Sequence, residues 1–292
     1  MMDPPMPSSS SADDGMIAAP QSSSPLALVR ESTRRVAQSA THVRINREAA
    51  AALASPSGRL RESEVAASLR GKFFEFDDAS HVIANDDALT AQLILAIDAV
   101  NFCFWPDGEL EYEHVSGGLS ACARRDPSAL SADRLAEVTG PDLRRMMGWA
   151  RPLPQEEERA RLLREVGDGL RRCFGGRAAS LVEAADGSAS RLVDLVTSHF
   201  PGFRDHAIHD GAQVFLYKRA QIFVADLWGA FKGCGLGSFG DVDALTTFAD
   251  YRVPVVLREL GVLEYDDALA AHVAAKEEIL PGSAYEIEIR AW

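Results

Sequence analysis

Apolar residues recur along most of the chain at the three- and four-residue spacing that is typical of amphipathic helices. This spacing predicts one or two helices over Leu26–Ala54, a helix that opens at Gln155 and a helix capped by Ser188. The two-residue alternation of a strand is weak over Glu109–His114 and clearer over Tyr285–Ile289. The pattern therefore predicts a mostly α fold with a minor β element.

The densest apolar run covers residues 213–232, where almost every face of a helix is apolar, as in a buried helix. Lys218 lies on this run, with Val214 and Ile222 on the same stripe. Its stem can follow the apolar surface while its ammonium reaches solvent. Alternatively, its ammonium points into a pocket that binds an anion or a carboxylate. The residue types leave both interpretations open.

A glycine-rich hairpin follows this helix, with Gly233, Gly235 and Gly237 at alternate positions. A dinucleotide-binding fingerprint needs a strand before the glycines, and here a helix precedes them, so dinucleotide binding is disfavoured. A short second helix is expected over Asp241–Phe248. This order is the helix-hairpin-helix arrangement known from DNA glycosylases, in which a catalytic aspartate follows shortly after the hairpin.

Asp250 occupies the position of that aspartate. Pro254 suits the first turn of a helix and Gly261 suits its end, so a helix is predicted over residues 251–260. The free N–H groups and dipole at the start of this helix favour the ionised carboxylate, which can stabilise or attack an oxocarbenium-like centre. The alternative is that Asp250 only caps the helix, which is a common role for aspartate.

Several long motifs narrow these alternatives. They are YKRAQIFVADLWG, the GxGxGSF segment after it, TTFADYRVPVVLRELGVLEY, and the shorter segments Asp98–Trp105, His199–Asp205 and Glu286–Arg290. Together they resemble the queuosine salvage family of queuosine 5′-phosphate N-glycosylases. The resemblance covers about residues 26–292 and is strongest from Leu192 onward.

The resemblance implies a single helical domain with a helix-hairpin-helix, DNA-glycosylase-like core. It also implies hydrolysis of the N-glycosidic bond of queuosine 5′-monophosphate, which releases queuine and ribose 5-phosphate for queuine salvage and tRNA modification. Asp250 would be the catalytic carboxylate and Lys218 its lysine partner. His81 would contact the base, although a lone histidine is as often a surface or hydrogen-bonded structural residue. The remaining candidate substrate-binding residues are Phe248, Tyr251, Arg252 and Phe239.

The charge balance restricts the substrate. The chain has 30 basic and 43 acidic residues, a formal net charge of -13, whereas proteins that bind a nucleic-acid backbone usually have a basic surface. A mononucleotide needs only a local cationic pocket. Composition therefore favours a nucleotide hydrolase over a DNA base-excision glycosylase. Because no metal-ligand cluster stands out, we expect catalysis without a metal or other cofactor.

Residues 1–25 are rich in serine and proline and are expected to form a disordered tail, followed by one domain over residues 26–292. The longest apolar stretches fall short of the roughly 18 residues of a membrane helix. The four cysteines are widely and irregularly spaced, which favours neither a disulfide framework nor a zinc site. We expect a cytoplasmic monomer without membrane contact.

The end of the chain differs from the family pattern. The sequence stops at Trp292, whereas family members continue into a further helix and an aromatic, acidic segment that contacts the ligand. We therefore expect a C-terminally shortened member of the family. A non-catalytic relative that binds queuosine nucleotide or queuine is the alternative, and a DNA base-excision glycosylase is a third.

Overall fold

The computed structural model describes residues 24–55 and 77–292. Most of these residues are helical, and the strands form two antiparallel pairs, β1 with β4 and β2 with β3. The mostly α fold with a minor β element is confirmed. The predicted disordered tail lies outside the described residues except for Ser24 and Pro25.

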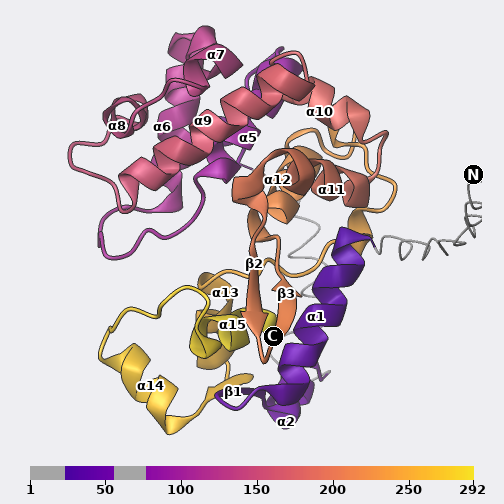
Figure 1. The fold of residues 1–292 in the computed structure, drawn as a ribbon, viewed down its shortest axis with the longest axis vertical. Helices are drawn as coiled ribbons and strands as arrows, with labels where there is room; N and C mark the ends of the chain where they lie inside the picture. The colour runs from indigo at the N-terminus through magenta and orange to yellow at the C-terminus, as the bar shows by residue number, and fades with distance from the viewer. Residues whose placement is uncertain (1–23, 56–76) are drawn as a thin grey trace, which may run out of the picture.

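The main hydrophobic core is formed by helices that gather in the upper part of Figure 1, around α5. α5 is apolar on nearly every face, and Leu93, Ile94, Leu95 and Ile97 are fully buried. The elements of this part are α4 (Asp78–His81), α5 (Asp87–Ala99), α6 (Tyr112–Arg125), η1 (Pro127–Leu130), α7 (Ala132–Leu135), α8 (Gly140–Met147), α9 (Glu156–Cys173), α10 (Ala178–Ala184), α11 (Ala189–His199), η2 (Pro201–Phe203) and α12 (Lys218–Ala230).

A smaller part of the molecule lies below, and α1 runs beside both parts (Figure 1). Two small apolar clusters hold it together: one joins Val36 of α1 to Ile287 of α15, and the other joins Val43 to Leu269. Its elements are α1 (Pro25–Ser39), β1 (Val43–Ile45), α2 (Arg47–Ala54), β2 (His206–His209), β3 (Ala212–Phe215), α13 (Arg252–Glu259), β4 (Leu263–Tyr265), α14 (Asp267–Ala274) and α15 (Ala284–Ala291). The short turns η3 (Gly235–Gly237) and η4 (Val242–Ala244) pack against the main core.

Both strands predicted from alternation are wrong. Residues 109–111 have no regular structure and α6 begins at Tyr112, while Ala284–Ala291 form helix α15. α15 is stabilised locally, because Ser283 accepts a hydrogen bond from the Glu286 N–H and Glu286 pairs with Arg290 one turn later. Short alternating segments are ambiguous, and here capping and side-chain pairing favoured the helix.

Other sequence predictions are confirmed in part. The helix over residues 251–260 is α13, and Ser188 caps α11. The buried helix begins at Lys218 rather than residue 213, because residues 212–215 pair with β2 and Tyr217 has a left-handed φ of 50°. Gly233 and Gly235 have positive φ. The expected helix Asp241–Phe248 is only the turn η4, so the helix-hairpin-helix detail is not confirmed.

Arg159, on α9, has the largest fully buried side chain among the described residues, with 1% of the residue surface exposed. Its guanidinium donates hydrogen bonds to the backbone carbonyls of Val100, Phe102, Cys103 and Pro154. These bonds fix the turn that follows α5. Buried carbonyls that lose a donor carry a desolvation penalty, so this one side chain has a large structural role.

We predict that Arg159→Met lowers the free energy of unfolding by about 3 kcal/mol, because several buried carbonyls lose a charged donor. Arg161→Met is the matched control, since the Arg161 side chain is 47% exposed and pairs with Glu158 and Glu165. It should change the stability by less than about 1 kcal/mol. Urea denaturation of both variants measures the difference, and equal losses would contradict this role of Arg159.

Close helix packing gives a second pair of predictions. A Cβ atom at Gly167 of α9 would overlap the backbone of Ala132 and Ala136, whereas a Cβ at Gly117 of α6 meets nothing within 4 Å. Gly167→Ala should therefore destabilise the protein by about 2 kcal/mol. Gly117→Ala should stabilise it by about 0.5 kcal/mol, because alanine is the better helix former. The urea midpoints should move in opposite directions.

Candidate active site

Lys218 is the first residue of α12, and its side chain is buried, with 9% of the residue surface exposed. Its Nζ donates a hydrogen bond to the Asn101 carbonyl at 3.0 Å. The interpretation in which the ammonium reaches solvent is therefore wrong. Burial lowers the pKa of Lys218, while the nearby carboxylates of Asp250 and Asp98 act to raise it. The ammonium thus lies among acidic groups.

Asp250 lies just before α13 and is partly buried. Its Oδ1 accepts hydrogen bonds from the N–H groups of Arg252 at 2.8 Å and Val253 at 2.9 Å. Its Oδ2 accepts none from the part of the chain that the structure describes. Asp250 therefore caps the helix with one oxygen, and this leaves the other oxygen available for chemistry. The two interpretations of this residue are compatible.

An ion pair connects the segments that carry these two residues. The Arg290 guanidinium contacts Asp205 Oδ2 at 2.5 Å, and the Lys218 N–H donates to the same oxygen at 3.1 Å. Arg290 Nε also donates to the carbonyl of Ala249, directly before Asp250, at 2.9 Å. The side chain of Arg290 thus fixes the backbone on both sides of the candidate site.

Two further carboxyl groups lie close to Lys218. Asp98, near the end of α5, is fully buried, and neither of its oxygens has a hydrogen-bond partner among the described residues. Asp226 lies on α12, which packs against α5. Burial and the neighbouring charge of Asp226 raise the pKa of Asp98 well above its usual range. Burial raises the pKa of Asp226 to about 7.

His81 is buried at the end of α4 and has partners on both ring nitrogens. Nδ1 lies 3.0 Å from the Asp77 carbonyl, and Nε2 lies 2.5 Å from the Tyr112 hydroxyl. Burial is the main cause of the lowered pKa of His81, which favours the neutral ring. This hydrogen bonding matches that of a structural histidine, and its contact with a base stays a prediction.

The remaining candidates lie in different surroundings. Phe248 is partly buried two residues before Asp250. Tyr251 is 43% exposed, and its hydroxyl accepts a hydrogen bond from the Phe104 N–H at 3.4 Å. Arg252 is exposed and pairs with Glu111 at 3.4 Å. Phe239 packs into the main hydrophobic core. Phe248, Tyr251 and Arg252 are thus close to Asp250 in the sequence, whereas Phe239 is buried in the core.

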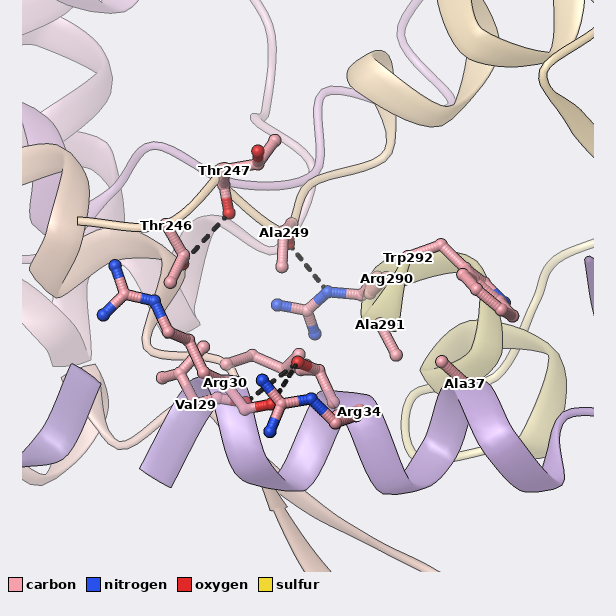
Figure 2. A pocket seen from close by; sticks show the side chains of 12 residues that line it. Val29, Arg30, Arg34, Ala37, Thr246, Thr247, Ala249, Arg290, Ala291 and Trp292 are labelled. Carbon is pink, nitrogen blue, oxygen red and sulfur yellow. Dashed lines mark hydrogen bonds between the residues drawn. The ribbon is translucent and has the colours of Figure 1, made fainter. Parts of the chain in front are cut away.

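A pocket of about 370 Å³ is lined in part by Thr246, Thr247 and Ala249, which precede Asp250 in the chain. Figure 2 shows Arg30 and Arg34 rising from α1, Thr246 and Thr247 on the opposite wall, and Arg290 at the side. Arg290 is already neutralised by Asp205 and Glu286. The other two arginines, Arg30 and Arg34, add positive charge to the pocket next to the segment that precedes Asp250.

Within residues 24–55 and 77–292, no group of three or more histidine, cysteine or acidic side chains is placed to hold a metal ion. The four cysteines, all in these ranges, are unpaired. None of the helices in these ranges has the length and hydropathy that a membrane span requires.

Sequence reasoning did not assign roles to Asp98, Asp205, Asp226 or Arg290. A signal was available for two of them, because Asp98 and Asp226 are charged residues inside otherwise apolar helices. Asp205 and Arg290 end two of the quoted motifs. Their pairing joins positions 85 residues apart, which no local pattern reveals.

Comparison with known proteins agrees with the motifs. The chain matches the model of the family called Queuosine salvage protein over residues 81–292. It is similar to the queuosine 5′-phosphate N-glycosylase/hydrolase of Dictyostelium discoideum, with 45% identity over 274 residues that cover 91% of this chain and 84% of the relative.

Two further relatives have the same name. The protein from Sphaerobacter thermophilus is 42% identical over 273 residues, which cover 90% of this chain and 81% of the relative. The protein from Bos taurus is 36% identical over 220 residues, which cover 70% of this chain and 64% of the relative. On the family match and these identities, the chain belongs to the queuosine salvage family.

Proposed function

We propose that this chain hydrolyses the N-glycosidic bond of queuosine 5′-phosphate and so releases queuine for salvage into tRNA. The names of its relatives specify this substrate and this reaction type. The observation that carries the proposal is the position of Asp250, whose Oδ1 is fixed by two N–H groups of α13. The same segment lies within electrostatic reach of the buried Lys218 ammonium.

The reaction breaks the bond between C1′ of the ribose and a nitrogen of the base. Positive charge develops on C1′, and the electron pair of the broken bond goes to the base, which takes up a proton. Water supplies the hydroxyl that completes ribose 5-phosphate. Asp250 stabilises the cationic centre or forms a transient bond to C1′, and both roles require an ionised carboxylate. The helix N-terminus favours that form.

Lys218 has three roles open to it in this mechanism. It can keep Asp250 ionised, contact the 5′-phosphate, or assist proton transfer to the departing base. Its contact with the Asn101 carbonyl holds the ammonium at the end of α5, beside the acidic groups. The first role agrees best with the mutual attraction between Lys218 and Asp250.

A small nucleotide is the substrate class that suits this protein. The net charge of -13 disfavours a nucleic-acid polymer, while the local cations Lys218, Arg252 and Arg290 lie near Asp250. A DNA base-excision glycosylase is therefore the less favoured alternative. Four unpaired cysteines suit a reducing compartment, so we place the activity in the cytoplasm. We further propose that the protein acts as a monomer.

We predict that Asp250→Asn lowers the rate of queuine release by about 1,000-fold, because the neutral amide cannot stabilise the cationic sugar. The fold should persist, since asparagine is an equally good helix cap. The measurement is mass spectrometry of queuine released from queuosine 5′-monophosphate. Asp243→Asn is the matched control, because Asp243 is exposed in the same connecting segment. It should release queuine at the unmutated rate.

The outcomes separate the alternatives. A folded Asp250→Asn variant with full turnover would remove Asp250 from the mechanism. Binding of the nucleotide without release by the unmutated chain would identify a non-catalytic relative. Cleavage of damaged duplex DNA, with no release from the nucleotide, would select the DNA glycosylase.

A further inference from the structure

Gln221 is a polar side chain inside the apolar helix α12, and the mechanism described above gives it no role. It lies three residues after Lys218, on the same side of the helix, and it is 0% exposed. A buried amide is costly unless both its donor and its acceptor are hydrogen-bonded. The partners of this amide therefore indicate what the side chain does.

Both ends of the Gln221 amide are hydrogen-bonded. Nε2 donates to the Leu216 carbonyl at 3.0 Å. Oε1 accepts two hydrogen bonds from Thr246, one from the backbone N–H at 2.9 Å and one from the hydroxyl at 3.0 Å. Because a carbonyl only accepts and an N–H only donates, these neighbours fix the orientation of the amide. An ionised glutamate would lack the donor, and methionine would lack both functions.

The bonds to Thr246 hold a segment that has no regular structure of its own. Residues 245–249 are neither helix nor strand, and Asp250 follows them directly. The position of such a segment depends on side-chain contacts, because no backbone ladder holds it. Gln221 holds the segment near its start, and Arg290 Nε donates to the carbonyl of its last residue at 2.9 Å. The carboxylate thus follows a segment that is fixed at two points.

We propose that Gln221 is a positioning residue, which sets the position of the Asp250 carboxylate relative to the Lys218 ammonium through its bonds to Thr246. Lys218 and Gln221 belong to one helix, so α12 carries one charged group of the site and holds the segment that leads to the other. This role requires no contact between Gln221 and the substrate. Its consequence for catalysis rests on the proposed function, whereas the hold on the segment does not.

Gln221→Met tests the hold on the segment, because it keeps the length of the side chain and removes both bonds to Thr246. Amide hydrogen exchange of the full chain, measured by mass spectrometry in peptides over residues 245–250, should become about tenfold faster. Phe223→Leu is the matched control, since Phe223 is fully buried on nearly the opposite side of α12. It should lower the urea midpoint and leave this exchange unchanged.

The kinetics of queuine release from queuosine 5′-monophosphate separate positioning from stability. Gln221→Met should lower kcat by about 30-fold, because a displaced carboxylate meets the sugar in the wrong geometry. KM should change by less than about threefold, since no group that could contact the nucleotide is removed. Phe223→Leu should retain the kcat of the unmutated chain although it is less stable.

Two variants of Thr246 test the same contact from its other end. Thr246→Val keeps the shape and loses the hydroxyl bond, so kcat should fall by about threefold. Thr246→Ser keeps both bonds and should have the kcat of the unmutated chain. In the Gln221→Met background, Thr246→Val should have no further effect, because the bond is already absent.

Unchanged exchange in Gln221→Met, faster exchange with an unchanged kcat, or equal effects of Thr246→Val in the two backgrounds would each overturn the proposal. If Gln221→Met does not fold, the contrast between Thr246→Val and Thr246→Ser decides, in exchange as well as in kcat. If the unmutated chain releases no queuine, the proposed function is rejected. The exchange measurements then still decide whether Gln221 holds the segment before Asp250.

Discussion

The ion pair between Arg290 and Asp205 is the interaction on which the candidate site depends. Asp205 receives the backbone N–H of Lys218, and Arg290 holds the carbonyl of Ala249. Lys218 belongs to the large helical part of the molecule, whereas Asp250 begins a helix of the smaller part (Figure 1). Because the two charges are largely buried, with side chains 19% and 20% exposed, they must stay together or carry the cost of an unpaired buried charge. The pair thus fixes the relative position of two segments that no continuous secondary structure connects.

The candidate site around Lys218 has more acidic than basic side chains. The carboxyl groups of Asp250, Asp98 and Asp226 lie within electrostatic reach of Lys218, so without bound protons these four groups would carry more negative than positive charge. Burial raises the pKa of both Asp98 and Asp226, and a carboxyl group that keeps its proton reduces this excess of negative charge. The protein therefore sets the charge around Lys218 by burial as much as by the choice of residues.

The sequence predicted the features that depend on local pattern. The apolar run around Lys218 identified a buried helix, and the Pro254 and Gly261 signals placed α13 within one residue at each end. It failed where pairing across the chain decides the structure. Val214 reads as helical, but it pairs with Ala207 in a hairpin. Tyr285–Ile289 alternates like a strand, but Ile287, Glu288 and Ile289 are all buried in a helix whose Glu288 accepts hydrogen bonds from the backbone at Val43. A long-range partner of this kind leaves no periodic signal.

The two oxygens of Asp250 have different surroundings, and this difference lowers the conformational entropy of the side chain. Oδ1 is held by two backbone N–H groups, so rotation about the Cα–Cβ and Cβ–Cγ bonds is restricted before any ligand arrives. In the proposed reaction, Oδ2 then faces the sugar in one orientation, and no rotamer search has to be completed in the transition state. The residue that caps the helix and the residue proposed to meet the cation are the same, so a substitution that retains the cap can remove the proposed chemistry while the helix remains.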